Sequence, residues 1–302
     1  NFGRSLPDEA AMGLSRKETG GGAIDQGDRR SSGSRFVTGK GPPVPTELEN
    51  YLFDLQGYLV LEDAVTVDHL SCLNGILETY LDMAQDTWRG NVHRVLDNTR
   101  SVHFRNIFEM GEAFERLIDH ASWIDYVNRF VGGDDGLCID ESFADIRDQG
   151  YASPLHSGGH KRRIRTQFRF HNSEFRCGQV NILLALTDVR ECDGPTMIIP
   201  GSHKSNLPHP AFRDRPESLD EVPGAVEIPL RAGDAVLFVD SCAHGAARRT
   251  SPGQRRMLIF RYGPHWANYR YGYVPSDALI GRLTAARRKI IQPLPPKLPP
   301  DA

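Results

Sequence analysis

The feature that most constrains the fold is a series of short, strand-like apolar segments in the second half of the chain. These segments are bounded by turns, with no helical pattern between them, and they cover 137–139, 142–147, 180–186, 197–199, 225–228, 235–239 and 257–262. Many short strands at modest spacing are typical of an antiparallel sandwich or barrel. The turn residues in Pro200-Gly201-Ser202 and in Arg231-Ala232-Gly233-Asp234 separate successive segments. We therefore expect a mainly β fold.

The part of the chain before these strands has mostly helical patterns. Thr46, followed three residues later by Glu49, predicts a capped helix over 46–53. Residues 57–61 then predict a buried strand. Apolar residues recur at helical spacing across 67–83 and again across 111–130. We expect a helical N-terminal part that packs around the β part.

Composition divides the chain into three parts. Residues 1–45 are rich in Gly, Ser, Arg and Asp, which predicts a flexible arm. Residues 46–275 carry the helical and strand patterns, and 302 residues are enough for one large domain of this kind with tails. Residues 276–302 are first helical and basic, and then so rich in proline that we expect an extended tail.

Charge and cysteine content exclude several classes of protein. A net charge of -3 gives no overall bias toward nucleic acid or membrane. The sequence has no apolar run long enough to span a bilayer and no signal-peptide pattern. Its five cysteines are scattered and form no CxxC pair, which predicts a reducing, cytoplasmic environment rather than a disulfide framework or zinc ribbon. Nothing in the sequence indicates an oligomeric state.

Two histidines lie at predicted strand ends. His156 stands in a glycine-rich turn, and His244 comes just after the strand 235–239. A non-haem ferrous site needs two imidazoles and usually one carboxylate on one face, which leaves positions for cosubstrate and oxygen. Arg255 opens the next predicted strand and could form a bidentate pair with the distal carboxylate of a 2-oxo acid. Taken singly, each of these residues has an ordinary structural explanation.

Several motifs in order give the chain a family resemblance. They are Gly57 to Val65 (GYLVLEDAV), Gly178 to Asp188, Asp193 to Lys204 (DGPTMIIPGSHK), Ala232-Gly233-Asp234 and His244-Gly245. Over roughly 46–270 the chain resembles the phytanoyl-CoA dioxygenase family. The resemblance implies a double-stranded β-helix, or jelly roll, with Fe(II) and 2-oxoglutarate as cofactors. It also implies that His156 and His244 bind iron, that Arg255 binds the cosubstrate, and that no catalytic residue is needed beyond the metal ligands.

The chain departs from the family at one position. The family pattern is His-x-Asp, whereas this chain has His156-Ser157-Gly158. Another carboxylate could fill the gap, and strand placement makes Glu174, Asp145 and Asp240 the candidates. A third histidine, His160 or His171, is a further option, because ferrous iron accepts imidazole. Alternatively, water or a halide takes the place, as in the ferrous 2-oxoglutarate halogenases that this pattern resembles, or the site holds no metal. Gly158 itself could simply serve a turn.

We therefore expect a 2-oxoglutarate-dependent dioxygenase that hydroxylates a small organic substrate. The alternatives are a halogenase and a non-catalytic jelly-roll binding protein. Residues 160–165, with Arg169 and Arg176, form a basic cluster that would favour an anionic substrate if it covers the site, although a solvated loop is the plainer interpretation. His203 follows a tight turn, where a structural role is sufficient.

Overall fold

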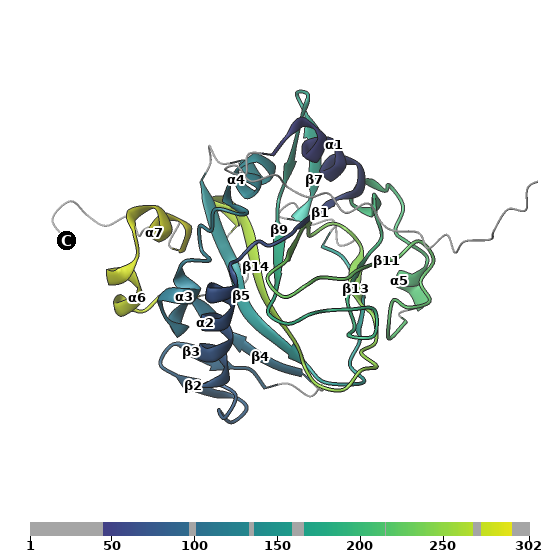
Figure 1. Ribbon diagram of the computed structural model, residues 1–302. Coiled ribbons are helices and arrows are strands. Elements are labelled where there is room, and N and C mark those ends of the chain that lie inside the picture. Colours follow the sequence, from purple (N-terminus) through teal and green to yellow (C-terminus); the bar gives the residue numbers. More distant parts are fainter. Residues whose placement is uncertain are drawn as a thin grey trace, which may run out of the picture. The chain divides into compact units, whose positions relative to one another are not determined.

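The computed structural model describes residues 45–96, 101–132, 136–158, 166–214, 216–267 and 273–291. Its largest element is an eight-stranded antiparallel sheet with the order β1-β12-β9-β14-β5-β4-β3-β2 (Figure 1). Its strands are β1 (Tyr58–Leu61), β2 (Thr87–Arg89), β3 (Val92–Arg94), β4 (Ser101–Arg105), β5 (Leu137–Arg147), β9 (Val180–Ala185), β12 (Ala235–Val239) and β14 (Arg255–Pro264).

A four-stranded sheet, in the order β11-β10-β13-β6, faces the large sheet. Its strands are β6 (Ser153–His156), β10 (Thr196–Ile198), β11 (Val226–Ile228) and β13 (His244–Ala246), and a separate hairpin pairs β7 (Phe168–His171) with β8 (Glu174–Cys177). The ring of Phe238 in β12 lies 4.7 Å from that of His244 in β13. Arg255 in β14 donates a hydrogen bond to Thr196 in β10. Two facing antiparallel sheets form the expected jelly roll.

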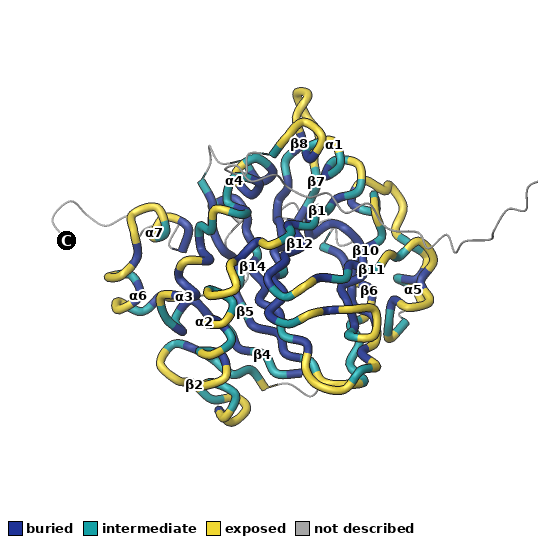
Figure 2. Tube along the Cα trace, viewed as in Figure 1, coloured by how far each residue is buried: buried dark blue, intermediate teal, exposed yellow. Residues whose placement is uncertain are grey.

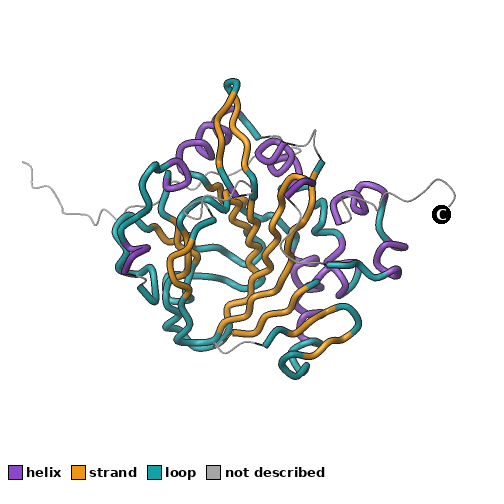
Figure 3. The backbone as a smooth tube through the Cα atoms, turned by 180° about the vertical axis from the view of Figure 1, so that it is seen from behind, coloured by secondary structure: helices purple, strands orange, loops and turns teal. Residues whose placement is uncertain are grey.

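The helices are α1 (Glu47–Gln56), α2 (Val67–Glu78), α3 (Glu112–Glu115), α4 (Ile124–Val127), α5 (Ala211–Asp214), α6 (Asp277–Arg282) and α7 (Ala285–Ile291). α2 and α3 lie over the large sheet, whereas α5 lies beside the small sheet (Figure 1). From behind, the strands cross the middle of the molecule, with helices around them (Figure 3). The centre of the large sheet is buried, whereas the β2 end is exposed (Figure 2). In the described residues, no helix has the length and apolar character needed to cross a membrane.

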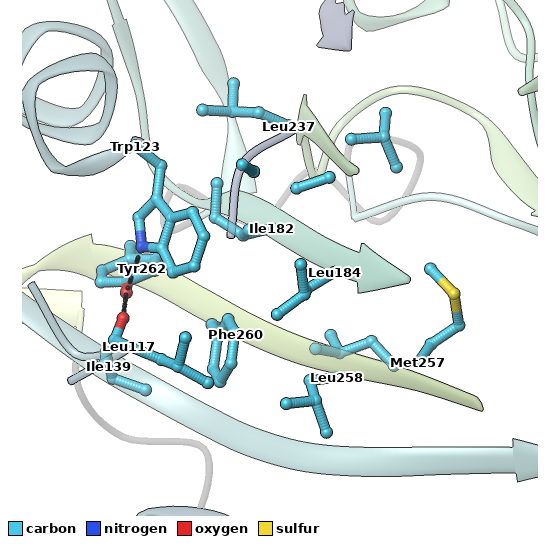
Figure 4. Packing of buried hydrophobic residues seen from close by; sticks show 14 of the residues in the cluster. Leu117, Trp123, Ile139, Ile182, Leu184, Leu237, Met257, Leu258, Phe260 and Tyr262 are labelled. Atoms are coloured by element: carbon cyan, nitrogen blue, oxygen red, sulfur yellow. Dashed lines mark hydrogen bonds between the residues drawn. The ribbon is translucent and has the colours of Figure 1, made fainter. Parts of the chain in front are cut away.

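Alternation along β14 separates the two faces of the large sheet. Leu258, Phe260 and Tyr262 are buried on the helix side (Figure 4). There the Tyr262 hydroxyl accepts a hydrogen bond from Nε1 of Trp123 at 3.1 Å. Because successive strand residues point to opposite faces, Arg255 and Arg261 point toward the small sheet instead. The sheet thus carries an apolar layer outside and a charged layer inside.

Most predicted elements are present. Thr46 caps α1 with the expected capping box to Glu49, and each predicted strand coincides with an observed strand, with 137–139 and 142–147 merged into β5. The prediction of one helix across 111–130 was wrong, because this segment breaks into α3, turns, α4 and a π-helical turn at Asn128–Gly132. Leu117, Ile118 and Trp123 are all fully buried there, so packing against the sheet overrides helical continuity.

The three-part division of the chain stays a prediction. Residues 1–44, which hold nearly all of the expected arm, lie outside the described residues, as do 292–302 with the proline-rich run. In the described part of the C-terminal segment, ion pairs of Arg282 with Glu115 and of Arg287 with Asp119 join α6 and α7 to the rest of the domain.

Candidate metal and cosubstrate site

The two histidines singled out in the sequence are brought face to face. β13 pairs with β6 in a register that sets His244 directly opposite His156. Their ring centroids lie 4.1 Å apart, and the ring planes are inclined by 55°. His244 is only 7% exposed, whereas His156 keeps a solvent-accessible edge.

Both imidazoles are held in the same tautomer. Nδ1 of His156 lies 2.9 Å from the carbonyl oxygen of Pro154, and Nδ1 of His244 lies 2.8 Å from that of Cys242. Because a carbonyl oxygen can only accept, each Nδ1 carries the proton and each Nε2 presents a lone pair. In the described part of the chain, neither Nε2 has a hydrogen-bond partner. Metal-binding histidines are normally oriented in this way.

The surroundings keep both rings neutral. Burial, followed by the neighbouring His156, lowers the pKa of His244 well below its usual value. Desolvation by the surrounding protein also lowers the pKa of His156, although one edge of its ring stays accessible to solvent. Since only a neutral imidazole can bind a metal, the pair is ready to accept a cation at physiological pH.

Arg255 lies in the same interior and lacks some of its hydrogen bonds. It is 2% exposed, and Nη2 donates to Oγ1 of Thr196 at 3.1 Å. Nη1 is 3.6 Å from Oδ2 of Asp145, but neither Nη1 nor Nε makes a hydrogen bond to any residue that the structure describes. Burial lowers the pKa of Arg255 to about 9. Such a guanidinium fits a carboxylate ligand, because buried donors without acceptors are costly.

Asp145 does not serve as the missing carboxylate ligand. Its Oδ2 lies 2.6 Å from Nε of Arg147, in an ion pair that is not aligned as a hydrogen bond. Its Oδ1 accepts from Nε2 of His103 at 2.7 Å. Burial alone would raise the pKa of Asp145, but Arg147 and His103 hold it well below its usual range. This carboxylate therefore balances the arginines beside the cosubstrate position.

The other residues considered as a third metal ligand differ in where they lie. Glu174 lies exposed on β8, where it forms an ion pair with Arg176. His171 is exposed on the β7–β8 hairpin, and residues 159–165, with His160 and most of the basic cluster, lie outside the described residues. Asp240, by contrast, is 4% exposed and accepts a hydrogen bond from the backbone of Gly158 through its own carbonyl.

No group of three His, Cys, Asp or Glu side chains in the described ranges is arranged to hold a metal ion. Of the ligands predicted from the sequence, the fold brings the two histidines together. His203 lies elsewhere and is structural: it is buried, and its Nε2 lies 3.0 Å from the carbonyl oxygen of Asp54 in α1.

Comparisons with known proteins agree with this geometry. The family model for phytanoyl-CoA dioxygenase matches residues 53–257, so the chain belongs to that family. The dioxygenase cdmD of Talaromyces verruculosus is 27% identical over 197 residues, which are 62% of this chain and 59% of that protein. The chain therefore spans less than two thirds of this curated relative.

Solved structures share the fold. HygX from Streptomyces hygroscopicus, with nickel and 2-oxoglutarate bound, matches with a TM-score of 0.62 and 24% identity over 74% of this chain and 88% of HygX. The epimerase SnoN of nogalamycin biosynthesis, with Fe3+, α-ketoglutarate and nogalamycin RO, matches with a TM-score of 0.55 and 14% identity over 75% of this chain and 90% of SnoN. The expected family and jelly-roll fold are confirmed. The family model and the curated relative are both named as dioxygenases, and HygX and SnoN were solved with a metal ion and 2-oxoglutarate or α-ketoglutarate.

Proposed function

We propose that this protein is an Fe(II)- and 2-oxoglutarate-dependent oxygenase acting on a small organic substrate. The observation that carries the proposal is the opposed pair of neutral imidazoles, His156 and His244, each with Nδ1–H fixed on a backbone carbonyl and Nε2 free for a cation. Family membership supplies the class of reaction to which such a pair belongs.

Each site residue would have a defined task. His156 and His244 would hold the iron through Nε2. Arg255, with its unused Nε and Nη1 donors, would bind the distal carboxylate of 2-oxoglutarate, and the hydroxyl of Thr196 orients the guanidinium. When bound, iron and 2-oxoglutarate together supply the oxidising power for attack on an unactivated C–H bond. The protein's contribution is to position these groups and to exclude water.

Hydroxylation is the proposed outcome, with an anionic group on the substrate. For the latter, Arg261 is the candidate partner: it lies on the face of β14 toward the small sheet and is partly accessible, and a substrate anion would compete there with Glu141, whose Oε2 lies 3.3 Å from Nε of Arg261. The reaction type needs a direct test, because the solved relatives named above include an epimerase.

The test measures metal and cosubstrate binding before turnover. The anaerobic protein should bind one Fe(II), and added 2-oxoglutarate should then produce a visible charge-transfer absorption. With oxygen admitted, 2-oxoglutarate should be converted to succinate even without substrate. His244→Ala should abolish all three signals, whereas His171→Ala, which removes an exposed histidine from the hairpin, should leave them intact. Equal metal binding by the wild type and His244→Ala would contradict the proposal.

A further inference from the structure

Neighbouring side chains, rather than the backbone conformation, explain why residue 158 is a glycine. Its φ is outside the left-handed region that favours glycine. A Cβ at this position would lie 2.1 Å from Oδ2 of Asp240 and 2.6 Å from Cβ of Thr166. No side chain fits there while Asp240 and Thr166 keep their places. The position two residues after His156 is therefore not empty: a carboxylate from another strand end fills it.

Asp240 is fixed in that position by a chain of buried contacts. Its Oδ1 accepts from Nδ2 of Asn181 at 3.0 Å, and Oδ1 of Asn181 accepts in turn from Nε2 of Gln179 at 3.1 Å. The backbone N–H of Asp240 donates to the carbonyl of Gln179, and its carbonyl accepts from the N–H of Gly158. Hydrogen bonds hold both the side chain and the backbone of Asp240, so its carboxylate has a fixed position.

The same link ties the two histidine-bearing segments together. Next to Asp240, the carbonyl of Ser241 accepts a hydrogen bond from Oγ of Ser157 at 2.7 Å. Ser157 follows His156 directly, and Ser241 lies three residues before His244. Asp240 is thus built into the connection that sets the two imidazoles opposite each other.

Asp240 lies beside both histidine-bearing segments. Its Oδ2 is 2.1 Å from the position that a Cβ of residue 158 would take, two residues after His156, and Asp240 itself lies four residues before His244. A cation held between the two imidazoles would therefore lie in the field of this buried carboxylate. Among the three candidate carboxylates, Glu174 is exposed and Asp145 is engaged with arginines, so only Asp240 combines burial with proximity to the pair.

We propose that Asp240 supplies the negative charge of the metal site that the family pattern places at residue 158, and that Gly158 exists to leave it room. The inference rests on the proposed function, since it assigns a residue of the same site. Asp240 and the two histidines do not already form a three-residue metal group. Asp240 therefore acts from beside the ion, as an anion that strengthens its binding.

The inference predicts that the metal affinity needs one carboxylate, which either residue 158 or residue 240 can supply. Mn(II), which is stable to oxidation in air, serves as the probe, and its affinity is measured by titration of the purified full chain. Asp240→Asn keeps an acceptor for Asn181 but removes the charge, and it should weaken Mn(II) binding about 10- to 100-fold, as loss of outer partners commonly does. Asp240→Gly should weaken it similarly. The triple variant Gly158→Asp, Asp240→Gly, Thr166→Gly, which also removes the Thr166 side chain from the position of a Cβ at residue 158, should recover binding to within a few-fold of the wild type.

Two controls separate this result from general damage. Glu174→Gln removes an exposed carboxylate of the β8 strand and should leave the affinity unchanged. Melting curves identify any variant that has lost its fold, and if Asp240→Gly has, the conservative Asp240→Asn decides. The inference is overturned if folded Asp240→Asn binds Mn(II) as tightly as the wild type, or if the folded triple variant binds no better than Asp240→Gly. A wild type that binds no Mn(II), or binding indifferent to His244→Ala, would instead overturn the metal site itself.

Discussion

His156 and His244 occupy directly paired positions of β6 and β13, with ring centroids 4.1 Å apart. Side chains alternate between the faces of a strand, so a slip of one residue would turn one imidazole to the opposite face. The hydrogen bond from Ser157 to Ser241 and that from Gly158 to Asp240 hold the register next to the pair. The site therefore depends on strand pairing as much as on the two histidines.

Replacement of Arg255 should separate cosubstrate binding from metal binding. Arg255→Lys keeps the positive charge but loses the planar fork that matches a carboxylate. We expect 2-oxoglutarate to bind about 10- to 100-fold more weakly, with Mn(II) affinity unchanged because the histidines are untouched. Isothermal titration measures both affinities. If Arg255→Lys binds 2-oxoglutarate as the wild type does, the carboxylate binds elsewhere.

Acid should destabilise the protein through His120, far from the site. Burial, followed by the charge of His69, lowers the pKa of His120 to about 4 from its usual 6.5, and its Nδ1 accepts from the backbone N–H of Ser122. Between these two pH values the unfolded chain binds more protons than the folded one, so stability falls as the pH falls.

The expected loss between pH 6.5 and pH 4 is about 2 kcal/mol from this residue. His120→Asn retains an acceptor for Ser122 but does not titrate. Urea unfolding across this range should show a shallower decline for His120→Asn than for the wild type. Parallel curves for the two proteins would show that His120 does not control the acid sensitivity.

Two glycines should respond in opposite ways to alanine. Gly57 ends α1 with φ of 85°, and a Cβ there would lie 2.4 Å from Sγ of Cys242. Gly57→Ala should cost at least about 2 kcal/mol, since strain and a clash combine. Because the Cys242 carbonyl orients His244, metal affinity should fall as well.

Gly75 is the matched control for this change. It lies exposed within α2, and a Cβ there would meet nothing within 4 Å. Gly75→Ala should stabilise the protein by about 0.5 to 1 kcal/mol, because alanine is the better helix former, and it should leave Mn(II) affinity unchanged. Thermal melting and metal titration measure the two effects. A Gly57→Ala protein as stable as the wild type would contradict the close approach to Cys242.

The fold could be predicted from sequence wherever strands are apolar. β12 is a continuous run of buried residues and β9 and β14 are mostly buried, and each was predicted near its observed bounds. β2 and β3 went unrecognised because they form the polar end of the sheet, where Trp88 is exposed and Arg94 donates to the backbone carbonyls of Leu81 and Met83. Their strand character comes from the pairing of β2 with β3 and of β3 with β4, which no local pattern reveals.

Only some features of the candidate site could be predicted from the sequence. Family motifs pointed to His156, His244 and Arg255, and the structure brings the histidines together. The pairing of Gly158 with Asp240 could only be one option among several, because the two residues are distant in sequence and meet through the ends of β6 and β12. The engagement of Asp145 by Arg147 and His103 likewise depends on the register of β4 on β5.

Chloride distinguishes an open metal site from one with its own anion. If residue 158 left a vacant place, chloride would enter it and tighten metal or cosubstrate binding, as the halogenase alternative requires. With Oδ2 of Asp240 where a Cβ of residue 158 would be, we expect Mn(II) affinity of the wild type to be equal in chloride and in gluconate at matched ionic strength. Asp240→Gly removes the resident anion and should become chloride-dependent. Tightening of Mn(II) binding by chloride in the wild type would contradict this expectation and favour halogenation instead.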